Sequence, residues 1–192
     1  LIVIDPRRTE TVDSPHCRAD VHLALRPGTN VAILNSIAHV IVRENRHDPE
    51  FIKSRCEWQE FEHWAELVGS EEYSPDKIGP IAGVDPEDIR RAARIYSTGP
   101  QSTIYYGLGV TEHSQGSTGV MCLGNLGLAC GMYGREGVGV NPLRGQGNVQ
   151  GGSCLGSWPH VFSGYRFVTD DATRESFETE WGVELDSEPG LR

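Results

Sequence analysis

The chain has 192 residues, a formal net charge of −10 and a hydrophobic fraction of 38%. This length allows one domain with a sizeable core, or one domain and part of another, and the four Trp, six Tyr and five Phe argue against disorder. The acidic balance argues against nucleic acid as a general partner, because phosphate backbones are bound by surplus Lys and Arg.

The chain opens with the apolar, β-branched run Leu1-Ile2-Val3-Ile4, which is typical of a buried parallel strand. Because no lead-in precedes this run, we expect the sequence to begin inside a domain. The strand should end at Asp5-Pro6-Arg7-Arg8, where proline and charges interrupt it. A short second strand is expected around 20–25, followed by a turn at Arg26-Pro27-Gly28-Thr29-Asn30.

Capping residues indicate where the helices begin. Thr29 or Asn30 can cap a first helix, in which apolar residues recur at helical spacing as far as Arg43. Two more helices should begin with a capping aspartate followed by proline, at Asp48-Pro49 and at Asp85-Pro86. A further apolar stripe lies between these two starts, at 61–68.

A second β-branched and aromatic run, at 102–106, predicts another strand, and Gly107-Leu108-Gly109 predicts a tight turn at its end. A helix rich in small residues should follow over 117–130, its flat surface packed closely against a neighbour. This order of elements indicates an α/β fold with a parallel sheet, in which ligands lie beyond the carboxyl ends of strands. The NAD-binding pattern G-x-G-x-x-G fails, because Glu112 occupies the place of its third glycine.

Glycine is concentrated late in the chain, where 16 of the 23 glycines lie between Gly107 and Gly164. At 131–152 we expect no regular element, because glycines are too frequent. We expect an ordered loop there, because Asn, Gln, Arg and aliphatic residues are interleaved with the glycines. Such a loop offers donors, acceptors and backbone amides to a polar, anionic or heterocyclic ligand, and a purely structural loop is the alternative.

The five cysteines are widely spaced and form no C-x-x-C pair, so the sequence predicts buried free thiols rather than disulfides, a zinc site or iron–sulfur ligands. No apolar run is long enough to cross a bilayer. We therefore expect no direct membrane insertion and a cytoplasmic location, with a periplasmic one as the alternative.

The run Val-Asn-Pro-Leu-Arg-Gly-Gln-Gly-Asn-Val-Gln-Gly, from Val140 to Gly151, closely resembles a run in the catalytic subunits of molybdenum and tungsten formate dehydrogenases. The resemblance covers residues 1–192. Its other landmarks follow in the family's order at 4–7, 25–30, 38–41, 107–111, 125–126, 158–159 and 164–165. The alternatives are another molybdopterin oxidoreductase, such as a nitrate reductase, and a non-catalytic α/β binding module.

For the fold, the resemblance implies a three-layer, Rossmann-like α/β domain with a mostly parallel sheet. We expect residues 1–146 to form most of a domain that binds molybdopterin guanine dinucleotide, incomplete at its N-terminus. Residues 147–192 should begin a second, incomplete α/β domain, because the patterning changes after Gln146.

For the chemistry, the resemblance implies a bis(molybdopterin guanine dinucleotide) cofactor with molybdenum or tungsten, at which formate is oxidised to carbon dioxide. Asp5, Arg7, Gly28 and Asn30 would contact a guanine dinucleotide. Asn30 stands where Asp is expected, so it keeps an acceptor and loses the charge. Other cofactor contacts would come from Gly107, Leu108, Gly109, Thr111, Gly145 and Gln146.

Arg144 would be the catalytic arginine, since its planar guanidinium matches the two oxygens of formate. In the family, the motif for a 4Fe–4S cluster and the Cys or selenocysteine that ligates the metal lie upstream of the matched region. We therefore expect the isolated chain to bind neither metal nor cluster and to catalyse nothing. Electron-transfer subunits or domains are the partners that the resemblance implies.

Overall fold

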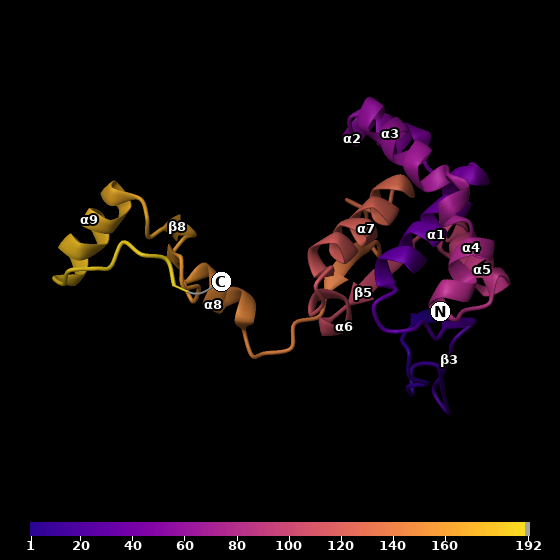
Figure 1. Ribbon diagram of the computed structural model, residues 1–192, viewed down its shortest axis with the longest axis horizontal. Coiled ribbons are helices and arrows are strands. Elements are labelled where there is room, and N and C mark those ends of the chain that lie inside the picture. The colour runs from indigo at the N-terminus through magenta and orange to yellow at the C-terminus, as the bar shows by residue number, and fades with distance from the viewer. Residues whose placement is uncertain (191–192) are drawn as a thin grey trace. The chain divides into compact units, whose positions relative to one another are not determined.

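The computed structural model describes residues 1–190 (Figure 1). The chain divides into two compact units, Leu1–Leu143 and Arg144–Arg192. The sequence predicted two domains that divide after Gln146, and this division into domains stays a prediction.

The strands of the first unit form two parallel pairs and one small hairpin. β1 (Ile2–Ile4) pairs in parallel with β4 (Val21–Leu23), and the hairpin of β2 (Asp13–Ser14) and β3 (Cys17–Arg18) lies between them in the sequence. β5 (Thr103–Tyr106) pairs in parallel with β6 (Gly139–Pro142). The predicted α/β class is confirmed, although the described parallel strands form two separate pairs rather than one continuous sheet.

Helix α1 (Asn30–Arg43) is the centre of this unit's core. Its apolar residues are almost wholly covered, with Ile33 and Ile41 at 0% exposure. Burying such a side chain contributes about 1.5–3 kcal/mol. The helices that pack against α1 are α3 (Trp58–Gly69), α4 (Pro75–Ala82), α5 (Pro86–Thr98) and α7 (Gly116–Ala129), as Figure 1 shows.

Two of the three predicted helix caps are confirmed by hydrogen bonds. The Oδ1 atom of Asp48 accepts from the backbone N–H of Phe51 at 2.9 Å and begins α2 (Pro49–Arg55). The Oδ1 atom of Asp85 accepts from the N–H of Glu87 at 2.8 Å and begins α5. The expected side-chain cap of α1 is wrong, because the hydroxyl of Thr29 donates instead to the carbonyl of Arg26 at 2.6 Å.

The glycine-rich stretch 131–152 contains regular structure that its composition did not predict. β6 lies within it, and α8 (Val149–Cys154) begins there. The expectation of no regular element is therefore wrong, because pairing with the distant β5 outweighs the weak strand preference of glycine. The same region explains the small residues of α7, since a Cβ atom on Gly127 would lie 2.7 Å from a ring carbon of Tyr133.

The first unit contains three further short helical elements that the sequence did not predict. They are α4, the 3-10 helix η1 (Glu71–Tyr73), and α6 (Leu108–Thr111). The turn expected at Gly107-Leu108-Gly109 is thus the extended Gly107, with φ −137°, followed by the single helical turn α6.

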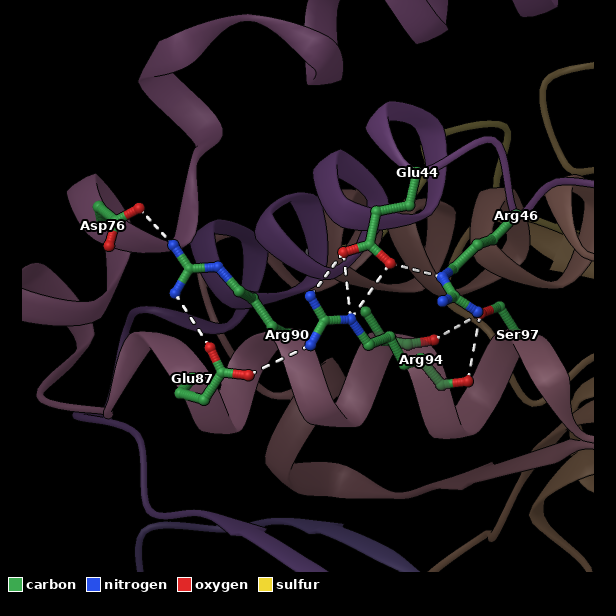
Figure 2. A network of polar contacts seen from close by, with 8 residues as sticks. Glu44, Arg46, Asp76, Glu87, Arg90, Arg94 and Ser97 are labelled. Atoms are coloured by element: carbon green, nitrogen blue, oxygen red, sulfur yellow. Dashed lines mark hydrogen bonds and ion pairs between the residues drawn. The ribbon is translucent and has the colours of Figure 1, made fainter.

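A network of ion pairs connects α1, α4 and α5 on the surface (Figure 2). Glu44, immediately after α1, accepts from Nη2 of Arg94 at 2.7 Å, and Arg94 also reaches Glu87 at 3.2 Å. Arg90 bridges Glu87 at 3.4 Å and Asp76 of α4. The hydrogen bond from Arg94 is the main reason that the pKa of Glu44 is lowered to about 2.

The second unit has a small aromatic core. After α8, β7 (Val161–Phe162) and β8 (Arg166–Phe167) form an antiparallel pair, and α9 (Asp171–Trp181) follows. The rings of Phe162 and Phe177 are 4.6 Å apart, and the guanidinium of Arg166 lies 4.3 Å from the ring centre of Phe177. Among the described residues of the chain, no helix combines the length and apolar character needed to span a bilayer.

Candidate functional site

The turn before α1 is anchored to α4 by Arg26. Its backbone N–H donates to the carbonyl of Ala82 at 2.8 Å, and its Nη1 atom donates to the carbonyls of Pro80 and Ile81, each at 3.1 Å. Last-turn carbonyls of a helix lack intrahelical partners, so these bonds satisfy α4 while they fix the turn. Gly28 then takes a left-handed conformation, with φ +89°, and leads the chain into α1.

The turn after β5 is equally constrained. The chain passes from extended Gly107 through α6 and reverses into α7 at Gly116. A Cβ atom on Gly116 would lie 2.1 Å from the carbonyl oxygen of Thr111, so this reversal requires glycine.

One hydrogen bond connects the two turns. The Nδ2 atom of Asn30 donates to the carbonyl oxygen of Gly109 at 3.3 Å. Beside it lies a cavity of about 150 Å³, lined by Gly28, Asn30, Val31, His113, Ser114 and Gln115. The structure therefore brings together three of the predicted cofactor-binding residues, namely Gly28, Asn30 and Gly109.

The lining of this cavity suits a polar ligand. Beside the apolar Val31, its side-chain groups are amides, a hydroxyl and an imidazole, which offer both donors and acceptors, and the lining includes no carboxylate. The first turn of α1 contributes unpaired N–H groups and carries no acidic residue. Asn30 uses one of its two Nδ2 N–H groups on Gly109, which leaves its second N–H as a donor and its Oδ1 atom as an acceptor for a ligand. This donor set fits the heterocyclic or phosphate parts of a dinucleotide.

Sequence reasoning missed His113, Ser114 and Gln115, which form half of the lining. A signal was present, because a polar run directly follows the predicted turn at the end of a strand, where ligands bind in α/β folds. Leu108 and Thr111 belong to the neighbouring turn α6 but do not line the cavity.

Asp5 and Arg7 lie at the carboxyl end of β1 and do not line this cavity. The Oδ1 atom of Asp5 accepts from the backbone N–H of Arg7 at 2.7 Å, and the Nε atom of Arg7 lies 3.6 Å from the same oxygen. The side chain of Arg7 is 81% exposed, so its guanidinium is accessible to a ligand.

Arg144, Gly145 and Gln146 belong to the second unit, where they precede α8 and are exposed. Within the described part of the chain, Arg144 forms no ion pair. The thiol of Cys154 lies 3.5 Å from the Tyr165 hydroxyl, and this hydrogen bond raises the pKa of Tyr165, while the charge of Arg144 opposes the rise.

All five cysteines are free in the structure, and the described residues contain no group of three His, Cys, Asp or Glu side chains that could hold a metal ion. Cys122 and Cys130 are buried as predicted, and burial raises the pKa of the Cys130 thiol to about 12. Cys17 and Cys56 are half-buried and Cys154 is exposed, so the prediction of buried thiols is wrong for these three.

Comparisons with known proteins identify one protein family and several relatives. The family model described as "Molybdopterin oxidoreductase" matches residues 1–177. Formate dehydrogenase H of Escherichia coli is 42% identical over 193 aligned positions, which cover 100% of this chain and 26% of that protein. The F420-dependent formate dehydrogenase subunit alpha of Methanocaldococcus jannaschii is 44% identical, again over 100% of this chain and 27% of its own length.

More distant matches include other enzymes. A nitrate reductase of Synechocystis is 32% identical, over 100% of this chain and 26% of that protein. The solved structure of acetylene hydratase from Pelobacter acetylenicus matches with a TM-score of 0.61 and 32% identity, covering 71% of this chain and 18% of that one. The chain thus spans about a quarter of the length of the curated relatives named here.

Proposed function

The chain belongs to the molybdopterin oxidoreductase family, and we propose that it is an internal part of a formate dehydrogenase catalytic subunit. Membership of this family implies a molybdopterin cofactor. The complete subunit would oxidise formate to carbon dioxide at molybdenum or tungsten held by two molybdopterin guanine dinucleotides. A 4Fe–4S cluster bound elsewhere in that subunit, and electron-transfer subunits or domains, would carry the electrons away.

Formate is favoured over nitrate as the substrate because this chain has a higher sequence identity to the two formate dehydrogenases than to the nitrate reductase. Two formate dehydrogenases match at 42% and 44%, whereas the Synechocystis nitrate reductase matches at 32%, and all three alignments cover the whole chain. A nitrate reductase remains the second candidate because that match is also complete. A non-catalytic binding module is the third, and it predicts that the complete protein contains no metal.

The cavity at the start of α1 is the feature that supports a dinucleotide. Its amide, hydroxyl and imidazole groups, with the helix N-terminus beside them, fit a base or a phosphate that needs no carboxylate. We propose that Gly28, Asn30 and Gly109 bind the cofactor there. Its further contacts would come from Asp5, Arg7, Gly107, Leu108, Thr111, Gly145 and Gln146.

Arg144 is proposed to bind the substrate. The cofactor supplies the redox chemistry, so the role left to the protein is to position formate and to stabilise charge. A guanidinium can donate two parallel hydrogen bonds to the two oxygens of formate, which orients its C–H bond. The exposure of Arg144 and the absence of an ion pair to the described residues leave those donors free.

The test uses the complete subunit that contains this chain. We expect purified protein to reduce a viologen dye with formate, to show no nitrate reduction with the reduced dye, and to contain molybdenum or tungsten. Nitrate reduction without formate oxidation would favour the second candidate. Protein without either metal, when it is produced in cells that make active molybdoenzymes, would favour the binding module.

A further inference from the structure

A shallow groove of about 300 Å³ lies between α2, α3 and α7, and it shares no residue with the cavity at the start of α1. Its apolar part includes Ile52, Phe61, Trp64 and Leu128. Leu128 is 37% exposed, so a large aliphatic side chain faces solvent at the edge of the groove. A groove of this size has room for a few apolar side chains and is too small for a folded domain.

The α3 side of the groove is held in shape by aromatic contacts. The ring of Phe61 lies 5.4 Å from that of Trp58, 5.9 Å from that of Trp64 and 5.2 Å from that of His47. Because these rings support one another, the surface is formed before a partner arrives, which lowers the entropic cost of binding.

The rim of the groove is acidic. Glu57 and Glu60 line it directly. They belong to a segment, 56–74, that contains six glutamates and no Lys or Arg. No Lys or Arg of the described chain lies within ion-pair distance of these six carboxylates. The nearest basic groups in sequence are on α2, where the ammonium of Lys53 lies over the ring of Trp58 at 5.0 Å and Arg55 follows.

We propose that this groove binds an amphipathic helix of a partner protein, with Leu-like side chains on one face and Lys or Arg along its borders. Apolar residues at helical spacing would fill the space beside Phe61 and Leu128, and the basic borders would meet Glu57 and Glu60. A wholly apolar partner would desolvate both carboxylates without pairing them, and an acidic partner would be repelled. Charge complementarity therefore selects a basic helix.

The experiment titrates the 192-residue chain with a synthetic Leu/Lys helical peptide and with a Leu/Glu peptide of the same apolar spacing. NMR chemical shifts locate the binding site, and the titrations give affinities. We expect the Leu/Lys peptide to shift signals of α2, α3 and α7 only. Its affinity should fall about threefold to tenfold in E57Q/E60Q at low ionic strength, since each exposed pair contributes little.

Two matched variants separate a local effect from general attraction to an acidic chain. E10Q/E136Q removes two exposed charges elsewhere and should leave the affinity unchanged, whereas Leu128→Lys should lower it at least about tenfold. Equal binding of the Leu/Glu peptide, or an equal loss in E10Q/E136Q, would overturn the proposal. So would exclusion of the Leu/Lys peptide from the complete subunit, because another segment of the same protein would then occupy the groove. Formate oxidation plays no part in this test.

Discussion

Replacing Glu44 by Gln should destabilise the first unit at neutral pH, because it removes the centre of the ion-pair network. Arg94 donates to Glu44 through Nη2 at 2.7 Å and through Nε at 3.1 Å to each carboxylate oxygen. A second arginine, Arg46, donates through Nε. These bonds connect the end of α1 to α5, and they favour the ionised form of Glu44 strongly enough to lower its pKa from 4.5 to about 2.

The size of the effect follows from the pKa shift and the exposure of the partners. A shift of this size corresponds to about 3 kcal/mol if nothing screens the charges. The side chain of Arg94 is 41% exposed, and exposed ion pairs contribute less than about 1 kcal/mol each. We therefore expect Glu44→Gln to lower the free energy of unfolding by about 1–2 kcal/mol. Because the pKa is lower in the folded state, this contribution is complete above about pH 4.5 and is lost as pH falls towards 2.

Urea unfolding of the wild-type chain, Glu44→Gln, Arg94→Gln and the double variant measures this contribution. The double-mutant cycle should give a coupling energy of about 0.5–1.5 kcal/mol at pH 7, falling to less than half near pH 3. Glu10→Gln is the control, because Glu10 is exposed and forms no ion pair with the described residues. A coupling energy below about 0.3 kcal/mol, or one that does not change with pH, would refute this reasoning.

Three further predictions test other parts of the chain. Asp48→Ala should lower the free energy of unfolding in urea by about 1 kcal/mol, because α2 loses its cap; no loss would show that the cap is dispensable. Gly116→Ala should cost about 1–3 kcal/mol or more by the same measurement, since its Cβ atom would clash with backbone, whereas Gly147→Ala, with open space around it, should be tolerated and serves as the control. In the complete enzyme, Arg144→Lys should lower kcat/KM for formate more than about a hundredfold at unchanged metal content, because Lys keeps the charge and loses the two-point geometry. Near-normal kinetics at full metal occupancy would remove Arg144 from the proposed site.

The elements that the sequence predicted well are those whose signals are local. The caps at Asp48 and Asp85 are read within one helical turn, and the apolar spacing of α1 is read within fourteen residues. β6 could not be found in this way, because residues 139–142 become a strand only through pairing with β5 far earlier in the chain. The composition of residues 139–142 predicted a loop, whereas pairing with β5 makes them a strand.

In the candidate site, too, the sequence predicted what depends on local signals and missed what depends on long-range contacts. Gly28 and Asn30 were identified from the turn and the resemblance, and the structure joins that turn to Gly109 through one side-chain hydrogen bond. No sequence pattern specifies this bond, because it connects residues 79 positions apart. The lining residues His113 to Gln115 depend on it, since the cavity exists only where the two turns meet.

The anchoring of Arg26 has a consequence for how the cavity can evolve. Three hydrogen bonds to the end of α4 fix the turn that carries Gly28 and Asn30, independently of the residues across the cavity. A ligand therefore has little need to order this turn, so little of the free energy of its contacts is lost to loop ordering. Mutation at His113, Ser114 or Gln115 can then change what the cavity prefers without moving the frame that surrounds it. Selection can act on specificity and on architecture separately.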